Sequence, residues 1–403
     1  MVIYGIFIPV GIILQLKLYL EVEFMSKILE QNAQWLDATW AKVDRKLSKV
    51  CIRSREIIPY LSENGVHIDN TVTPWSWVNG FWGGMMWLMY VNTKNEEYKI
   101  TALRAEELLD EGLKYFKELH HDVGFMWHLT AVANYRITGN PVPANKALFL
   151  ASSLSARYNI DGQFIQAWNN FSNPWTIIDT LMNLPLLYWA DTEVGDTRFG
   201  KIARRHADMA IRDHIRPDGS VNHIVMHDPL TGEVLGTRGG QGYCEGSAWT
   251  RGCSWAVYGM AISYLHTGEQ RYLDAAIHAA DYFVEKCREN NYLTKLDFCQ
   301  PEEDNYYDST AGVITACGLI EIGKALGGER GEYYIGEAIQ ILKATDEHFC
   351  NYNEDEDPLV MMGSVAYPHK PSLYNKQNIP IIYGDFFYVD ALAKLKGSDF
   401  LIW

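Results

Sequence analysis

The sequence lacks clustered positive charge. Lys and Arg total 35 against 50 Asp and Glu, giving a formal net charge of −15 at pH 7, and no basic run appears along the chain. Because affinity for nucleic acids rests on clustered lysine and arginine, this balance argues against a nucleic-acid partner. The charged share of 21% and hydrophobic share of 48% are those of an ordinary globular protein.

Cysteine pairs with metal or redox spacing are missing. The seven cysteines are odd in number, scattered between Cys51 and Cys350, and never spaced as CxxC. This usage is typical of a reduced protein, so we expect a cytoplasmic location. The motifs GxSxG, HExxH, GxGxxG and GxxxxGK[ST] do not occur. The consecutive residues His120, His121 and Asp122, followed by a distant His128, do not have a recognised metal-ligand spacing. We therefore predict no metal site and no cofactor.

A membrane-spanning segment or signal peptide is not predicted. Residues 2–16 are mostly apolar but have no preceding basic residue, contain Pro9 and lack a small-residue cleavage site. The run is short for a membrane span, so we expect no membrane partner. We interpret residues 1–24 as an N-terminal extension of doubtful status and residues 25–403 as a single domain. Ser26 is expected to cap its first helix.

Aromatic residues, in contrast, are abundant. The chain has 13 Trp, 24 Tyr and 15 Phe, together 13% of its length. A buried indole N–H needs a partner, so a core does not easily use so many tryptophans, whereas a groove that stacks flat sugar faces can. The composition therefore suggests a carbohydrate ligand.

Helical hairpins repeat along the chain. Tyr90, Tyr135, Trp189 and Tyr264 each stand three residues before a threonine near the end of an apolar helical stretch. Glycine follows two of these threonines, as expected where a left-handed residue ends a helix. A second, more polar helix follows each stop, at residues 98–118, 144–156, 197–214 and 271–288. Two further hairpins pair 309–326 with 332–349, and 386–395 with the helix from Ser26. Strand patterns are weak and confined to residues 220–225 and 377–383.

Six hairpins predict an all-α fold, an (α/α)6 toroid of twelve helices, because a run of such repeats must close or be capped. Aromatic and acidic residues precede the first helix of each hairpin. Since the inner helices of such a ring run in one direction, these clusters would converge at one mouth. We predict that this mouth is the functional site.

Three residues at the predicted mouth could carry chemistry. Asp122 begins a helix, where an N-cap is the ordinary role of aspartate. Asp179 lies in an apolar stretch, where desolvation would raise its pKa and make it a proton donor near neutrality. Arg251 stands between Trp249 and Trp255, a setting suited to bidentate recognition of a carboxylate, such as that of an acidic sugar.

Four motifs together resemble the unsaturated glucuronyl hydrolases of glycoside hydrolase family 88. They are WVNGFWGG at 77–84, HDVGF at 121–125, IDTLMNLPLL at 178–187, and QGY at 241–243 with WTRGCSW at 249–255. The resemblance spans about residues 26–396. It implies an enzyme that removes the unsaturated uronic acid from the non-reducing end of lyase-generated oligosaccharides, by protonation and hydration of the enol-ether double bond.

The resemblance also implies roles for residues of this chain. Asp179 would be the general acid and base, and Asp122 its essential partner, which also binds sugar hydroxyls. Substrate contacts would come from Trp77, His121, Trp168, His223, Gln241, Trp249, Arg251 and Trp255. The chain departs from the family pattern at Gly240, where many relatives have histidine, and at Cys253, where glutamine is more usual.

Alternatives stay open at this point. An unsaturated rhamnogalacturonyl hydrolase would use the same toroid, and a non-catalytic sugar-binding protein could share the aromatic mouth. The spacing of Asp122 and Asp179 does not separate hydration of a double bond from ordinary two-carboxylate hydrolysis. The expected partner is a small acidic oligosaccharide, an unsaturated disaccharide, with the glycan and the oligomeric state left open.

Overall fold

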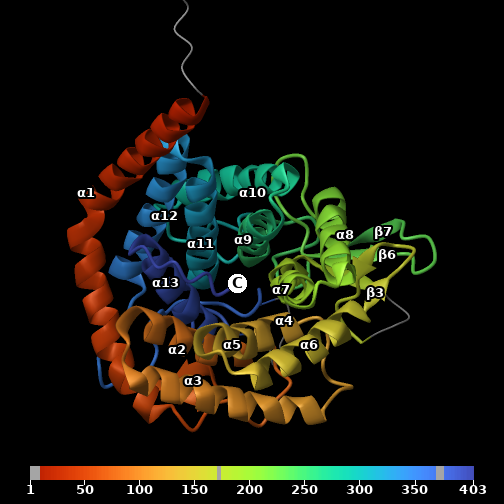
Figure 1. Ribbon diagram of the computed structural model, residues 1–403, viewed down its shortest axis with the longest axis horizontal. Coiled ribbons are helices and arrows are strands. Elements are labelled where there is room, and N and C mark those ends of the chain that lie inside the picture. Colours follow the sequence, from red (N-terminus) through yellow and green to blue (C-terminus); the bar gives the residue numbers. More distant parts are fainter. Residues whose placement is uncertain (1–9, 170–173, 369–375) are drawn as a thin grey trace, which may run out of the picture.

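The helices form two concentric rings around a common centre (Figure 1). The computed structural model describes residues 10–169, 174–368 and 376–403, with side chains from residue 27 onward. Each inner helix is followed by an outer one, and the first helix of the chain closes the outer ring. The architecture is the predicted all-α (α/α)6 toroid.

The inner ring consists of apolar helices that are buried along most of their length. A helix that is hydrophobic on every side requires such complete burial. The inner elements are α2 (Asn79–Thr93), α4 (Val123–Trp127) with a π-helical turn (His128–Val132) and α5 (Ala133–Thr138), a 3-10 turn (Ile178–Met182) with α7 (Pro185–Val194), α9 (Thr250–Thr267), α11 (Ser309–Leu326) and α13 (Ile382–Leu395).

The outer ring is more polar and covers the inner one. Its members are α3 (Glu96–Leu109), α6 (Pro141–Ser155), α8 (Thr197–Asp213), α10 (Gln270–Glu289), α12 (Gly328–His348) and α1 (Val10–Arg53). Helix α1 contacts both α12 and α3, so the last and first hairpins meet (Figure 1). Asn95, Asn140 and Asp196 cap α3, α6 and α8 by accepting a backbone N–H two residues ahead.

The predicted helix ends at Gly139 and Gly268 are confirmed, whereas the predicted helix start at Ser26 is not. Gly139 and Gly268 end α5 and α9 with φ of 73° and 68°, as the left-handed stop requires. The predicted cap at Ser26 is wrong, because α1 begins at Val10 and passes through Ser26. No proline or glycine interrupts residues 12–26, so nothing in the chain forces the backbone out of the helix there. The division between residues 1–24 and 25–403 stays a prediction.

Another helix is shorter than predicted. The segment expected to be helical to residue 118 leaves the α-helix at Leu109 and continues as a 3-10 turn, Asp110–Lys114. Helix α11 is long and apolar enough to cross a membrane by length and composition, but 83% of it is buried inside the ring. That burial is the pattern of a core helix.

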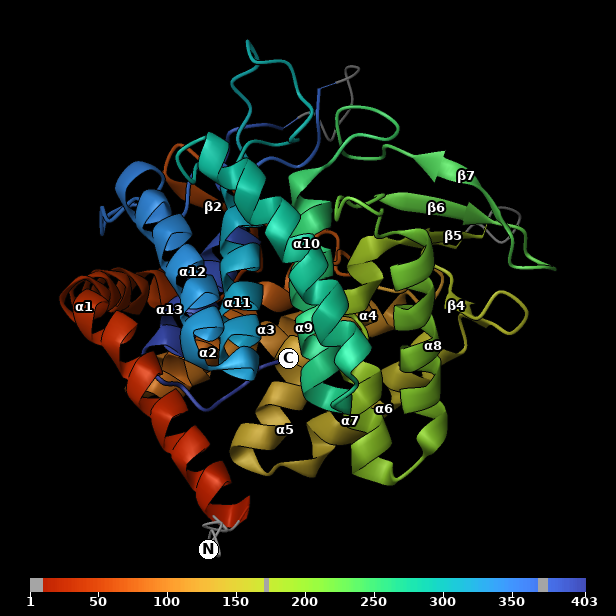
Figure 2. The same ribbon diagram turned by 90° about the horizontal axis from the view of Figure 1, so that it is seen from above.

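Short strands supplement the helices among the described residues. β1 (Pro59–Glu63) pairs with β2 (Val66–Asp69), β3 (Tyr158–Asn159) with β4 (Phe164–Ile165), and β6 (Ile224–His227) with both β5 (Trp175–Ile177) and β7 (Val234–Arg238). The strand expected at 220–225 begins only at Ile224, and the segment 377–383 makes isolated bridges at Ile379 and Ile381 before α13. Strands β2, β5, β6 and β7 lie toward one end of the ring (Figure 2).

The centre of the ring is filled by aromatic side chains. Trp403 is 1% exposed and stacks on Phe387, with ring centroids 5.8 Å apart and planes 4° from parallel. Phe125 packs against both Trp403 and Trp255. Trp255 also lines a cavity at one end of the ring, so the packed aromatic centre forms the floor of that cavity.

Candidate active site

A cavity of about 590 Å³ opens where the inner helices begin. Trp77 precedes α2, Asp122 precedes α4, Asp179 lies in the 3-10 turn before α7, and Arg251 lies in the first turn of α9. Tyr383, in the first turn of α13, also lines the cavity, so residues from the starts of five inner helices converge at one mouth as predicted, whereas the cluster before α11 does not line it. The predicted residues that line the cavity are Trp77, Asp122, Trp168, Asp179, His223, Gln241, Trp249, Arg251 and Trp255.

His121 is the predicted contact residue that does not line the cavity. Its side chain is fully buried behind the wall, where Nδ1 lies 2.8 Å from the Thr180 hydroxyl. Burial lowers the pKa of His121 well below its usual value. A direct contact between His121 and a sugar is thus not supported by its position, although its ring stands beside Asp122.

Part of the wall comes from segments that carried no motif. Tyr60 belongs to β1, and residues 365–367 belong to the loop between α12 and α13. The loop is bound to the predicted site, because Gln241 Nε2 donates to the Val365 carbonyl (2.6 Å) and the Tyr367 N–H donates to the Gln241 carbonyl (2.8 Å). The high aromatic content was the only sequence signal that pointed to these tyrosines.

Asp179 has a carboxyl oxygen without a hydrogen-bond partner. Its Oδ1 is buried and accepts no hydrogen bond from the described residues. Burial raises the pKa of Asp179 to about 7, against the opposing effects of nearby backbone N–H groups and Arg251. The pairing of Ile177 with Ile224 positions this turn beside His223. Asp179 lines the cavity, and with a pKa of about 7 its carboxyl is partly protonated near neutrality.

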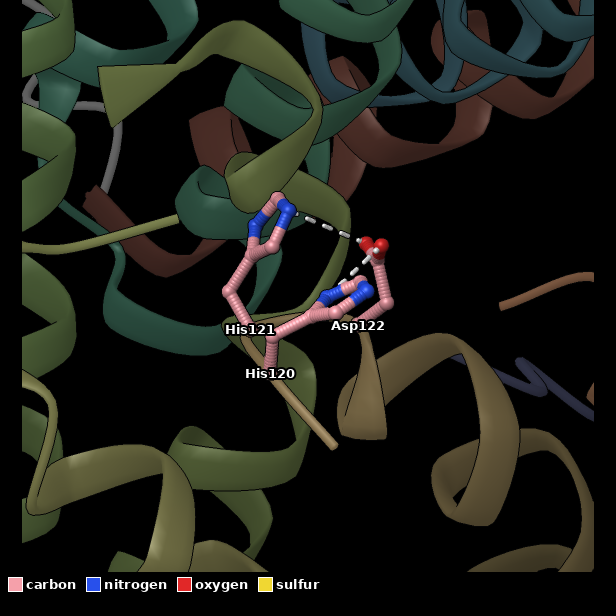
Figure 3. Close-up of side chains that lie close together, drawn as sticks. All are labelled: His120, His121 and Asp122. Carbon is pink, nitrogen blue, oxygen red and sulfur yellow. Dashed lines mark ion pairs between the residues drawn. The ribbon is translucent and has the colours of Figure 1, made fainter. Parts of the chain in front are cut away.

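Asp122 is surrounded by two histidines (Figure 3) and an asparagine. His120 Nδ1 lies 3.3 Å from Asp122 Oδ2, and His121 Nε2 lies 3.4 Å from Oδ1. The Asn183 amide donates to Oδ1 at 3.1 Å. Burial, and then the nearby charge of Asp179, raise the pKa of Asp122 well above its usual value. Asp122 precedes α4 but makes no side-chain cap bond, so the N-cap role is not what holds it there.

Asn183 links the two segments that carry the carboxyl groups. Its Nδ2 contacts Asp122, while its Oδ1 accepts the Phe125 N–H at 2.7 Å. Gly124 allows this approach, since a Cβ there would lie 2.5 Å from the Asn183 Cα. The motif containing Asn183 was recognised in the sequence, but its bridging position depends on tertiary contact.

Arg251 lines the cavity and is already paired within the protein. It is 1% exposed and forms an ion pair with the Asp308 carboxylate. Its terminal nitrogens also donate to the carbonyls of Ser364 (2.5 Å) and Val365 (2.7 Å). The carboxylate that the guanidinium fork meets here is that of Asp308, and recognition of a substrate carboxylate by Arg251 stays a prediction.

His223 lies against the Trp249 ring, with centroids 4.2 Å apart. Its Nδ1 accepts the Gln241 N–H at 3.1 Å. Burial lowers the pKa of His223 to about 3, so the ring is neutral at pH 7. Gly240, the first of the two family departures, lies directly over this ring with a φ of +59°. Cys253, the second departure, is fully buried in α9 and does not line the cavity.

An aromatic cavity with two carboxyl groups of raised pKa, set in a helical toroid, defines a carbohydrate-active hydrolase: the rings can stack sugar faces, and the acidic pair can move protons. The model of Glycosyl Hydrolase Family 88 matches residues 54–312, more than half of the chain. The chain belongs to this family and is a glycoside hydrolase.

Relatives agree over most of the chain. It is 35% identical to an unsaturated glucuronyl hydrolase of Bacillus sp. (strain GL1), covering 83% of this chain and 89% of the relative. It is 30% identical to an unsaturated chondroitin disaccharide hydrolase of Streptococcus pneumoniae (strain R6), covering 96% of both. The crystal structure of the unsaturated glucuronyl hydrolase from Bacillus sp. GL1 superposes with a TM-score of 0.83 at 30% identity, covering 90% of this chain and 97% of that one.

Proposed function

We propose that the protein is an unsaturated glucuronyl hydrolase, which removes a 4,5-unsaturated uronic acid from the non-reducing end of lyase-generated oligosaccharides. The observation that carries this proposal is the carboxyl of Asp179 at the wall of an aromatic cavity, whose buried Oδ1 has no hydrogen-bond partner among the described residues. Family membership and the named activities of the relatives support the substrate class.

The chemistry begins with a proton transfer. The substrate's enol ether, conjugated with its carboxylate, is easily protonated at carbon 4, and Asp179 donates that proton. Water adds at carbon 5 and returns a proton to Asp179. The resulting hemiketal opens at the bond between carbon 5 and the ring oxygen, which leaves a ketone at carbon 5 and a hemiacetal at carbon 1. Collapse of that hemiacetal to the aldehyde releases the aglycone, and no covalent glycosyl enzyme forms.

Asp122 supports this step from beside Asp179. Burial raises the pKa of both carboxyl groups, and the charge of Asp179 raises that of Asp122 further, so the pair holds a proton near neutral pH. With Asn183 holding one oxygen, Asp122 is positioned to bind sugar hydroxyls. The tryptophans at 77, 168, 249 and 255 form the walls against which the sugar rings stack.

Isotope labelling distinguishes this reaction from ordinary hydrolysis. In heavy water, protonation by Asp179 leaves deuterium on carbon 4 of the released keto acid, and oxygen from labelled water enters at carbon 5. A two-carboxylate hydrolase that protonates the glycosidic oxygen leaves carbon 4 unlabelled and puts the oxygen label at carbon 1. A saturated glucuronide should be inert, and its efficient cleavage would contradict the proposed mechanism.

A substrate panel identifies the glycan. Unsaturated disaccharides from chondroitin, hyaluronan, heparin, gellan, xanthan and rhamnogalacturonan are compared by the loss of enol-ether absorbance. The unsaturated rhamnogalacturonyl alternative would show preference for the last of these. Asp179→Asn is the matched control: it should bind the preferred disaccharide yet show no turnover, because an amide keeps the shape but cannot cycle a proton. Near-normal turnover would remove Asp179 from the mechanism.

The cytoplasmic location is a separate part of the proposal and rests on cysteine usage alone. Cell fractionation with an antibody against the full chain tests it. The small acidic oligosaccharide is the partner that the substrate panel examines directly.

A further inference from the structure

Three consecutive side chains, His120 and Asp122 at the cavity wall and His121 behind it, bring nitrogen and oxygen atoms close together (Figure 3). One ligand atom each from His120, His121 and Asp122 lie within 4.8 Å of one another. The two histidine nitrogens stand 3.3 and 3.4 Å from the Asp122 oxygens. Spacing in sequence predicted no metal here, because consecutive ligands match no common motif, but the backbone before α4 turns all three toward one point.

The two histidine nitrogens are buried and approach the Asp122 carboxyl without making a hydrogen bond to it. His120 Nδ1 and His121 Nε2 have no hydrogen-bond partner among the described residues. Buried polar atoms are nearly always hydrogen-bonded, so two nitrogens that face one carboxyl group without a hydrogen bond need an explanation. The His121 ring is fixed from behind by the Thr180 hydroxyl at 2.8 Å, which is the arrangement that orients metal-binding histidines.

The spacing is close to that of a tetrahedral ion. Zinc bonds of about 2.0–2.1 Å to nitrogen and oxygen place neighbouring ligand atoms about 3.3–3.4 Å apart in a tetrahedron. His120 Nδ1 lies 3.3 Å from Asp122 Oδ2 and His121 Nε2 lies 3.4 Å from Oδ1, so each nitrogen has a different oxygen as its neighbour. One ligand atom from each of the three residues lies within 4.8 Å of the others, so binding requires these atoms to close by at most about 1.4 Å. His120 and Asp122 also line the 590 Å³ cavity, which supplies an entry path and room for a water in the fourth position.

We propose that His120, His121 and Asp122 form a binding site for Zn²⁺ or a similar divalent transition-metal ion, and that the bound ion inhibits the enzyme. The ion occupies the cavity wall and engages the carboxylate that would bind sugar hydroxyls. The inhibition rests on the proposed function, whereas the binding does not.

Binding is tested with the metal alone on the full chain. After EDTA treatment and its removal, Zn²⁺ is titrated by calorimetry, and Co²⁺ is followed by its visible absorption, which is intense for a tetrahedral site. We expect one Zn²⁺ per chain, with affinity at least tenfold weaker in His120→Ala. His348→Ala is the matched control, because His348 is exposed at the end of α12. Absence of binding, or equal affinity in His120→Ala and the wild type, would overturn the site.

Inhibition is measured separately on the preferred unsaturated disaccharide. Zn²⁺ should slow the wild type and the His348→Ala variant, and EDTA should restore the rate. In His120→Ala, the zinc concentration for half inhibition should rise at least tenfold, measured against that variant's own zinc-free rate. Stoichiometric binding without inhibition would overturn the inhibitory role. If no disaccharide is cleaved, the proposed function fails while the calorimetric result still decides the metal site.

Discussion

Gly240→Ala is expected to damage the cavity through one added methyl group. Gly240 has a φ of +59°, and a Cβ there would lie 2.1 Å from His223 Nδ1 and 2.9 Å from Ile224 Cδ1. Gly139 is the matched control, since its φ is +73° and a Cβ there would meet nothing within 4 Å. Both substitutions place alanine in the left-handed region, but only Gly240→Ala also creates a collision.

The magnitude follows from these two effects. Left-handed strain costs about 1–2 kcal/mol in either variant. In Gly240→Ala, the His223 ring must also retreat by about 1.4 Å to reach a normal contact of about 3.5 Å. This movement breaks the 3.1 Å bond from the Gln241 N–H, and overpacking of this kind typically costs a further 1–3 kcal/mol, roughly. A misplacement of about 1 Å in a site can lower turnover by about 100-fold.

The assay compares the free energy of unfolding in urea with kcat/KM on the preferred unsaturated disaccharide. We expect Gly139→Ala to lose stability alone, and Gly240→Ala to lose more stability together with at least tenfold in kcat/KM. Equal stability and equal kcat/KM in the two variants would refute the reasoning, because it would mean that the ring of His223 is not held where the substrate needs it.

Four further outcomes are expected. Activity should be highest below about pH 7 and fall roughly tenfold per pH unit above it. The reason is that the pKa of Asp179 is raised to about 7, so its protonated form is lost as the pH rises. A rate that climbs through pH 8 would contradict this assignment. Asn183→Ala should destabilise the fold by about 2–4 kcal/mol and reduce kcat, since it removes a hydrogen-bond donor to Asp122 and leaves the buried Phe125 N–H unpaired. An unchanged urea midpoint would show that Asn183 does not link the two segments. Arg251→Lys should lower the melting temperature and also weaken substrate binding. The lysine ammonium cannot replace the planar guanidinium at its three acceptors, the Asp308 carboxylate and the carbonyls of Ser364 and Val365. A change in KM alone would show that this internal pairing is unimportant for stability. Trp168→Ala, at a residue that is 37% exposed, should raise KM about fivefold with little effect on unfolding, and an unchanged KM would remove this wall from the substrate site.

The amino-acid sequence alone determined the helical repeat. Hydrophobic period, helix stops and polar second helices are local properties, so Gly139 and Gly268 could be recognised as stops without any knowledge of neighbours in space. The raised pKa of Asp179 was also predictable from the apolar residues around it in the chain, and burial is what raises it in the fold. Ring closure followed, since repeats with exposed apolar ends must cover them.

Tertiary structure decided which groups meet across the ring. Arg251 pairs with Asp308, and the loop at 365–367 reaches Gln241 from more than a hundred residues away, contacts that no local pattern encodes. The position of Asp122 at the start of a helix is by itself typical of an N-cap, yet its carboxyl turns to His120 and to Asn183 instead. Local periodicity specifies each element because its forces act within a few residues. The distances between side chains of different elements depend on how all twelve helices close together, and so only the folded ring determines them.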